Sequence, residues 1–61
     1  MKRRDLLRHI EANGARFLRE GGNHTIFFNP ANRKVSAIPR HRDIFEQLVS
    51  KICKDLGIPK P

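Results

Sequence analysis

The stretch Gly21-Gly22-Asn23-His24-Thr25-Ile26-Phe27-Phe28 decides the fold, because a glycine-containing turn is followed directly by β-branched and aromatic residues. Glycine and asparagine between two apolar runs are typical of a β-hairpin, and the residues after them are those enriched in strands. The sequence therefore predicts a strand over residues 15–20, a turn over residues 21–23 and a second strand over residues 24–29. A third strand is predicted over residues 34–38.

Helical patterns flank the predicted strands on both sides. Leu6, Leu7 and Ile10 recur at helical spacing, and Asn13-Gly14 is a typical helix end, which predicts a first helix over residues 3–13. The apolar side of this helix should pack against the sheet.

A longer helical pattern begins at Asp43. Glu46 follows three residues later, as in a capping box, in which the two side chains satisfy free backbone N–H groups of the first turn. Gly57 and Pro59 end the pattern. Its apolar face consists of Phe45, Leu48, Val49, Ile52 and Leu56. This second helix is predicted to be the longest element.

The predicted element order α-β-β-β-α belongs to the α+β class. A chain of 61 residues forms one small domain, residues 1–61, because it buries only about 60% of the surface of its unfolded form. Each element must bury an apolar side, so we expect a three-stranded antiparallel sheet with both helices on one face. The single Cys53 cannot form an internal disulfide, and the three histidines match no zinc-site spacing. We expect Cys53 in the core or its flank, no metal site and a cytoplasmic location.

The positive charge of the chain is unevenly distributed. The formal net charge is +7, and residues 21–42 carry four Arg or Lys and no Asp or Glu. A cationic surface attracts nucleic acid through its phosphates without any base contact, although such a charge can also serve solubility alone. No apolar run approaches the length of about 20 residues that a membrane span needs. These patterns favour an anionic partner and exclude a membrane-spanning protein.

The glycine-histidine stretch quoted above and a second short motif together resemble a known protein family. Gly-Gly-Asn-His at 21–24, the aromatic strand after it, and Ile-Pro-Arg-His at 38–41 before the last helix resemble the HicA-type mRNA interferase toxins, over nearly the whole chain. The resemblance implies a fold similar to double-stranded-RNA-binding domains. It also implies the toxin of a type II toxin–antitoxin system, a metal-independent endoribonuclease that needs no cofactor and cleaves mRNA. A HicB-like antitoxin would neutralise it, and operator DNA would be contacted only through the complex with the antitoxin.

The resemblance also assigns the catalytic residue. The family's catalytic histidine corresponds to His24, and Gly21 and Gly22 would form the turn that presents it. An imidazole has a reference pKa of about 6.5, which suits general acid or base catalysis near neutral pH. His41 is a possible auxiliary group, and its alternative role is to hydrogen-bond the turn before the second helix.

Basic side chains near these histidines are candidates for RNA binding. Arg40 and Arg42 are expected to hold the phosphate, and Arg33 and Lys34 to contact the flanking backbone. Phe27 and Phe28 could stack on bases, but at least one of them must fill the core of so small a domain.

Two rival functions fit the same patterns. The first is a non-catalytic module of the double-stranded-RNA-binding type, which would need the fold and the charge but not the histidine. The second is a protein-interaction domain whose cationic face meets an acidic partner. Cleavage of RNA by the purified chain in EDTA would exclude both.

Overall fold

The helices and strands follow one another in the predicted order. The computed structural model describes residues 1–61. Helix α1 spans Arg3–Ala12, strand β1 Arg16–Gly21, β2 His24–Asn29 and β3 Lys34–Pro39, and helix α2 spans Glu46–Leu56. Helix α2 is the longest element, as predicted.

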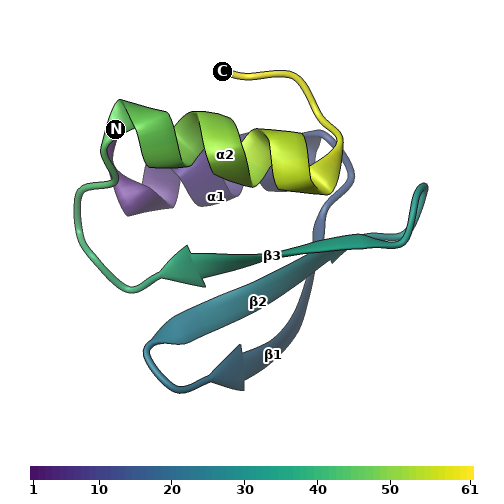
Figure 1. The fold of residues 1–61 in the computed structure, drawn as a ribbon, viewed down its shortest axis with the longest axis horizontal. Coiled ribbons are helices and arrows are strands. Elements are labelled where there is room, and N and C mark those ends of the chain that lie inside the picture. The colour runs from purple at the N-terminus through teal and green to yellow at the C-terminus, as the bar shows by residue number, and fades with distance from the viewer.

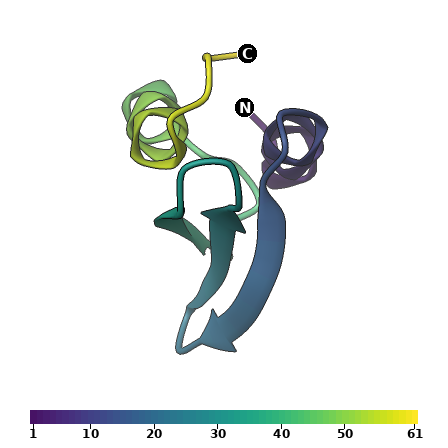
Figure 2. The same ribbon diagram turned by 90° about the vertical axis from the view of Figure 1, so that its right-hand side faces the viewer.

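The molecule has two layers, one of strands and one of helices. The strands form an antiparallel sheet in the order β1-β2-β3, so β2 is the central strand. Both helices lie side by side on one face of this sheet, and no element covers the other face (Figures 1 and 2). The predicted α+β architecture is confirmed.

The core lies between these two layers. Along β2 the side chains of Thr25, Phe27 and Asn29 are buried, whereas the alternate side chains are more exposed. Phe27 is only 3% exposed and meets the ring of Phe17 edge to face, with 6.3 Å between the ring centroids. The buried apolar residues are Leu6, Ile10, Ala15, Phe27, Ile38, Ile44, Val49, Ile52, Cys53 and Leu56. Burial raises the pKa of the Cys53 thiol, as desolvation disfavours the thiolate.

A glycine in the left-handed region ends each helix, as the sequence predicts. Gly14, after α1, has φ +100°, and Gly57, after α2, has φ +69°. The N–H of Gly57 donates to the Lys54 carbonyl and that of Ile58 to the Cys53 carbonyl, each at 3.0 Å. This pair of bonds is the Schellman motif, which satisfies carbonyls left free at a helix end.

The start of α2 differs from the prediction. Phe45 is the N-cap residue, and no side chain caps the helix, so the predicted Asp43–Glu46 capping box is wrong. Asp43 instead forms an isolated antiparallel bridge with Lys2. Two backbone hydrogen bonds flank this bridge: Arg3 N–H to the Arg42 carbonyl at 2.8 Å, and Ile44 N–H to the Met1 carbonyl at 2.7 Å.

The same bridge explains the position of Phe45. Pairing with the N-terminal residues keeps the chain extended through Asp43, so the N-cap is Phe45, two residues later than predicted. Ile44 enters the core in consequence, and Phe45 is left 64% exposed. The predicted place of Phe45 on the buried face of α2 is therefore wrong.

Candidate functional site

The two motifs meet at one end of the sheet. His24, the first residue of β2, pairs with Gly21 of β1 on one side and with Pro39 of β3 on the other. The N–H of Arg40 donates to the Asn23 carbonyl at 3.3 Å. The glycine-histidine motif and the proline-arginine-histidine motif are thus adjacent in space although strands β2 and β3 separate them in sequence.

The turn that precedes His24 is shorter than predicted. Gly21 is the last residue of β1, so the two-residue turn consists of Gly22 and Asn23. Gly22 has φ +59° at the first central position, where a two-residue hairpin turn of type II′ requires glycine. A Cβ on Gly22 would meet no atom, so only the backbone conformation demands glycine there.

The His24 side chain is exposed and makes no hydrogen bond or ion pair within the protein. Because side chains alternate along a strand and Thr25 is buried toward the helices, the alternation places His24 with Ile26 and Phe28 on the uncovered face. An imidazole in this position is accessible to a ligand that approaches the sheet end.

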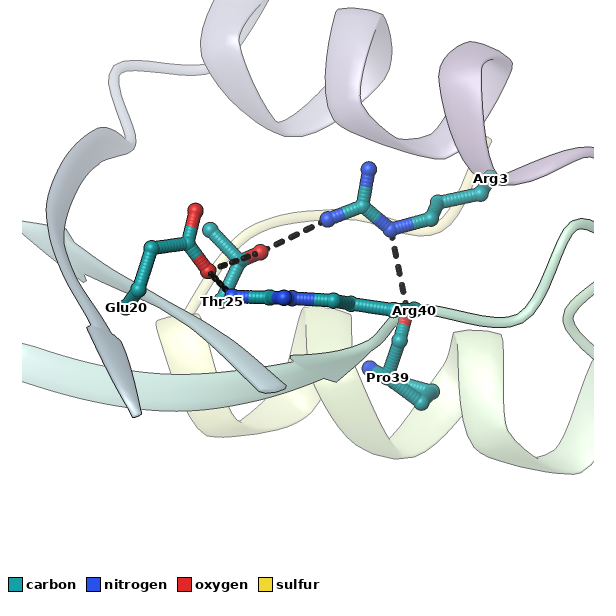
Figure 3. A network of polar contacts seen from close by, with 5 residues as sticks. All are labelled: Arg3, Glu20, Thr25, Pro39 and Arg40. Carbon is teal, nitrogen blue, oxygen red and sulfur yellow. Dashed lines mark hydrogen bonds and ion pairs between the residues drawn. The ribbon is translucent and has the colours of Figure 1, made fainter. Parts of the chain in front are cut away.

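A polar network fixes the backbone around His24 (Figure 3). Arg3 donates from Nε to the Pro39 carbonyl at 3.0 Å and from Nη2 to Thr25 Oγ1 at 2.7 Å. The hydroxyl of Thr25, a residue only 5% exposed, donates to Glu20 Oε1 at 3.0 Å. Arg3 therefore ties α1 to the chain neighbour of His24 and to its strand partner.

Arg40 joins the same network from the end of β3. Its Nη2 lies 2.5 Å from Glu20 Oε1, and both side chains are about half exposed. The hydrogen bond from Arg40 lowers the pKa of the Glu20 carboxyl, with a smaller contribution from Thr25. Arg40 thus has a carboxylate partner, and its predicted role in holding phosphate stays a prediction.

His41 and Arg42, the next two residues, are exposed, and their side chains bind no other residue. Both lie on the segment that leads from β3 to the bridge with the N-terminus. They are therefore free to meet a ligand at the His24 end of the sheet.

Arg33 and Lys34 lie at the opposite end. Lys34 pairs with Asn29, the last residue of β2, whereas His24 is the first. At about 3.4 Å per residue, these two ends of β2 are about 17 Å apart. The predicted RNA-binding residues therefore form two separate groups, and Arg33 and Lys34 can reach only a distant part of a strand bound at His24.

Sequence reasoning missed the basic residues at the start of α1. A cavity of about 230 Å³ is lined by Lys2, Arg3, Arg4 and Arg42 and by no apolar residue. The run Lys2-Arg3-Arg4 is visible in the sequence, but only the bridge to Asp43 shows that it lies beside Arg42. The role of Arg3 in the network has no signal in the sequence.

Two further findings concern possible metal ligands and membrane-spanning helices. No three His, Cys, Asp or Glu side chains come together as ligands for a metal ion would. Neither helix has both the length and the apolar character that crossing a membrane requires.

Comparison with known proteins identifies the family. Searches of the curated proteins and of the solved structures returned no match. A family model described as the HicA toxin of bacterial toxin–antitoxin matches residues 3–58, which include both helices, all three strands and both motifs. The chain therefore belongs to the HicA family, the toxins of bacterial toxin–antitoxin pairs.

Proposed function

We propose that this toxin is a metal-independent endoribonuclease that cleaves mRNA with His24 as the catalytic residue. The observation that carries the proposal is the exposed, unpaired imidazole of His24 at a sheet end whose backbone the Arg3 network fixes. Free cations stand nearby, on Arg42 and at the start of α1. A fixed site with a proton-transfer group and positive charge is what phosphodiester cleavage requires.

The chemistry uses the RNA's own nucleophile. The 2′-oxygen attacks the adjacent phosphorus as the bond from phosphorus to the 5′-oxygen breaks, which leaves a 2′,3′-cyclic phosphate and a 5′-hydroxyl. One proton leaves the 2′-hydroxyl and one is delivered to the 5′-oxygen. His24 carries one of these transfers, and His41 is the candidate for the other. Fixed cations stabilise the extra negative charge on phosphorus in the transition state.

The network gives Arg40 a role compatible with this chemistry. Because its guanidinium already pairs with Glu20, it holds β1 and β3 together beside His24 and can offer only its remaining N–H groups to phosphate. Arg42 has no such partner, and we assign to it the larger share of phosphate binding at the histidine. Arg33 and Lys34 would contact the strand further along.

The partner we propose is a HicB-like antitoxin that covers the His24 end of the sheet with acidic groups. A cell that makes such a ribonuclease must block it, and acidic groups opposite the free cations would also speed association. Modification of histidines by diethyl pyrocarbonate should then reach His24 in the free toxin and not in the complex. Equal modification in both states would mean that inhibition acts from a distance.

The decisive experiment is incubation of the purified chain with a long RNA in EDTA. We expect cleavage and products that end in a 2′,3′-cyclic phosphate, whereas an RNA with 2′-deoxy at the cut site should bind and stay intact. The rival function, a non-catalytic RNA-binding module, would give binding without cleavage of either RNA. The predicted likeness to double-stranded-RNA-binding domains stays a prediction.

A further inference from the structure

The cavity at the start of α1 has an unusual lining. Its four side chains, Lys2, Arg3, Arg4 and Arg42, are all cationic. Its volume of about 230 Å³ is several times the roughly 30 Å³ that one water molecule occupies in the liquid. Because every lining residue carries a positive charge, the occupant of the cavity should be anionic.

No carboxylate forms an ion pair with this lining, although the Arg3 charge contributes to the lowered pKa of Glu20. The ion pairs of the molecule join Met1 to Glu46, Arg40 to Glu20 and Lys51 to Asp55, and none includes a side chain of the cavity. Gathering four like charges without an ion-pair partner opposes folding, because their repulsion is relieved in the unfolded chain. A ligand that brings negative charge would remove this repulsion.

The cavity borders the candidate catalytic site. Arg3 lines it and also binds Thr25 and the Pro39 carbonyl, the two neighbours of His24 described above. These contacts use two of the five N–H donors of the guanidinium, so three remain for a ligand. Arg42 enters the lining from the segment that follows His41. His24 faces the uncovered side of the sheet and Arg3 the helix side, so a strand that passes around this end of the sheet would meet both.

We propose that this cavity binds a backbone phosphate of the same RNA strand that is cleaved at His24. The inference rests on the proposed function, which brings RNA to this end of the sheet. Guanidinium groups bind phosphate oxygens through paired N–H donors, and the Lys2 ammonium adds a mobile charge. The site would fix the position of the strand, so that the scissile phosphate lies at the imidazole.

The test compares two double variants that lose the same charge. Lys2→Gln with Arg4→Gln neutralises the exposed wall of the cavity, and neither side chain makes a hydrogen bond within the protein. Lys54→Gln with Lys60→Gln is the matched control, on the α2 end and the tail. Affinity for a 2′-O-methyl oligonucleotide, which cannot be cleaved through a 2′-hydroxyl, is measured at several salt concentrations.

We expect the slope of log K against log salt to become shallower by about 0.7 in the cavity variant, since one phosphate contact is lost from a single strand. The control should keep the wild-type slope. Equal slopes in the two variants would overturn the proposal. The proposal would also be overturned if the cavity variant kept the wild-type RNA slope but bound a hexaglutamate peptide more weakly than the wild type does. The cavity would then bind an acidic protein partner.

Two further measurements keep the result clear. Circular dichroism establishes that each double variant is folded, and Arg4→Gln alone, with a smaller change of slope expected, replaces the cavity variant if that one unfolds. Binding and cleavage are scored separately. If the cavity variant has a shallower slope than the control and the wild-type protein does not cut RNA, the phosphate site is supported and the nuclease is refuted. If the wild-type protein cuts RNA and the two variants have equal slopes, only the phosphate site is refuted.

Discussion

His24 is the residue on which the proposed chemistry depends. We predict that His24→Ala lowers the cleavage rate by about 100-fold or more, because a proton-transfer group is lost. The free energy of unfolding should change by less than about 1 kcal/mol, since an exposed side chain without partners contributes little packing. Initial rates on one RNA and thermal unfolding of both proteins test this. A folded His24→Ala that cuts at the wild-type rate would transfer the role to His41, for which His41→Ala is the companion variant.

Glu20 gives the network a pH dependence. Its folded-state pKa lies below its ordinary value of 4.5 because Arg40 donates a hydrogen bond to the carboxylate. The stabilisation is therefore complete above about pH 4.5 and is lost as the pH falls through the lower, folded-state value. We predict that Glu20→Gln lowers the melting temperature at neutral pH, and that the difference from wild type shrinks below pH 4.5. A difference that is constant from neutral to acidic pH would contradict this role.

At the scale of elements, the end of α2 is joined to the turn between β2 and β3. Asn29 and Asn32 donate from their side-chain amides to the Leu56 carbonyl at 2.9 and 3.0 Å. A Cβ on Gly57 would collide with the Asn32 amide. The glycine therefore permits both the left-handed backbone and the close approach of the turn.

Two glycine variants separate these effects. Gly57→Ala should destabilise the fold by more than Gly22→Ala, for which we expect about 1 kcal/mol from the left-handed backbone alone. Gly22 serves for comparison because its φ is also positive and no atom lies near a new Cβ, although its turn conformation differs from that of Gly57. Chemical denaturation measures both. Equal losses would show that the Asn32 contact adds nothing to stability.

The sequence predicts the features that depend on local patterns and misses those that depend on contacts between distant residues. Strand alternation and the helix-ending glycines Gly14 and Gly57 are local patterns, and they gave the elements and their order correctly. The capping box at Asp43 failed because pairing with Lys2, far away in the sequence, outweighs a local helix signal. The contact of Glu20 with Thr25 also depends on a register shift between Phe17 and Arg19 in β1, which no alternation pattern shows.

In the candidate site, too, local motifs are predictable from the sequence and contacts between distant segments are not. His24 was proposed from the short motif around it, and its neighbours in the motif lie where a hairpin puts them. The sequence predicts that Arg33 and Lys34 contact the flanking RNA backbone, but charge counts do not indicate that they lie at the other end of β2. The cavity at Lys2 and Arg42 requires two distant segments to meet, so no local pattern indicates it.

For the molecule as a whole, the net charge of +7 opposes folding as well as attracting anionic polymers. The ion pairs Arg40–Glu20 and Lys51–Asp55 are largely exposed and contribute little individually. We predict that raising NaCl from about 0.02 M to about 0.2 M increases the melting temperature, because screening weakens the general repulsion more than it weakens these few pairs. Thermal unfolding by circular dichroism measures the trend. A melting temperature that falls with NaCl would show that specific pairs dominate.

The bridge between Lys2 and Asp43 makes the candidate site depend on the first residues of the chain. The sheet is a meander of neighbouring strands, whereas this bridge, the Arg3–Pro39 contact and the cavity all require residues 2–4 to dock against residues 39–43. Proteins open locally in cooperative units at less cost than global unfolding. An excursion limited to residues 1–4 would leave Leu6 and Ile10 in the core and still break the bridge, the Arg3 contacts and the cavity, so the site can open without global unfolding.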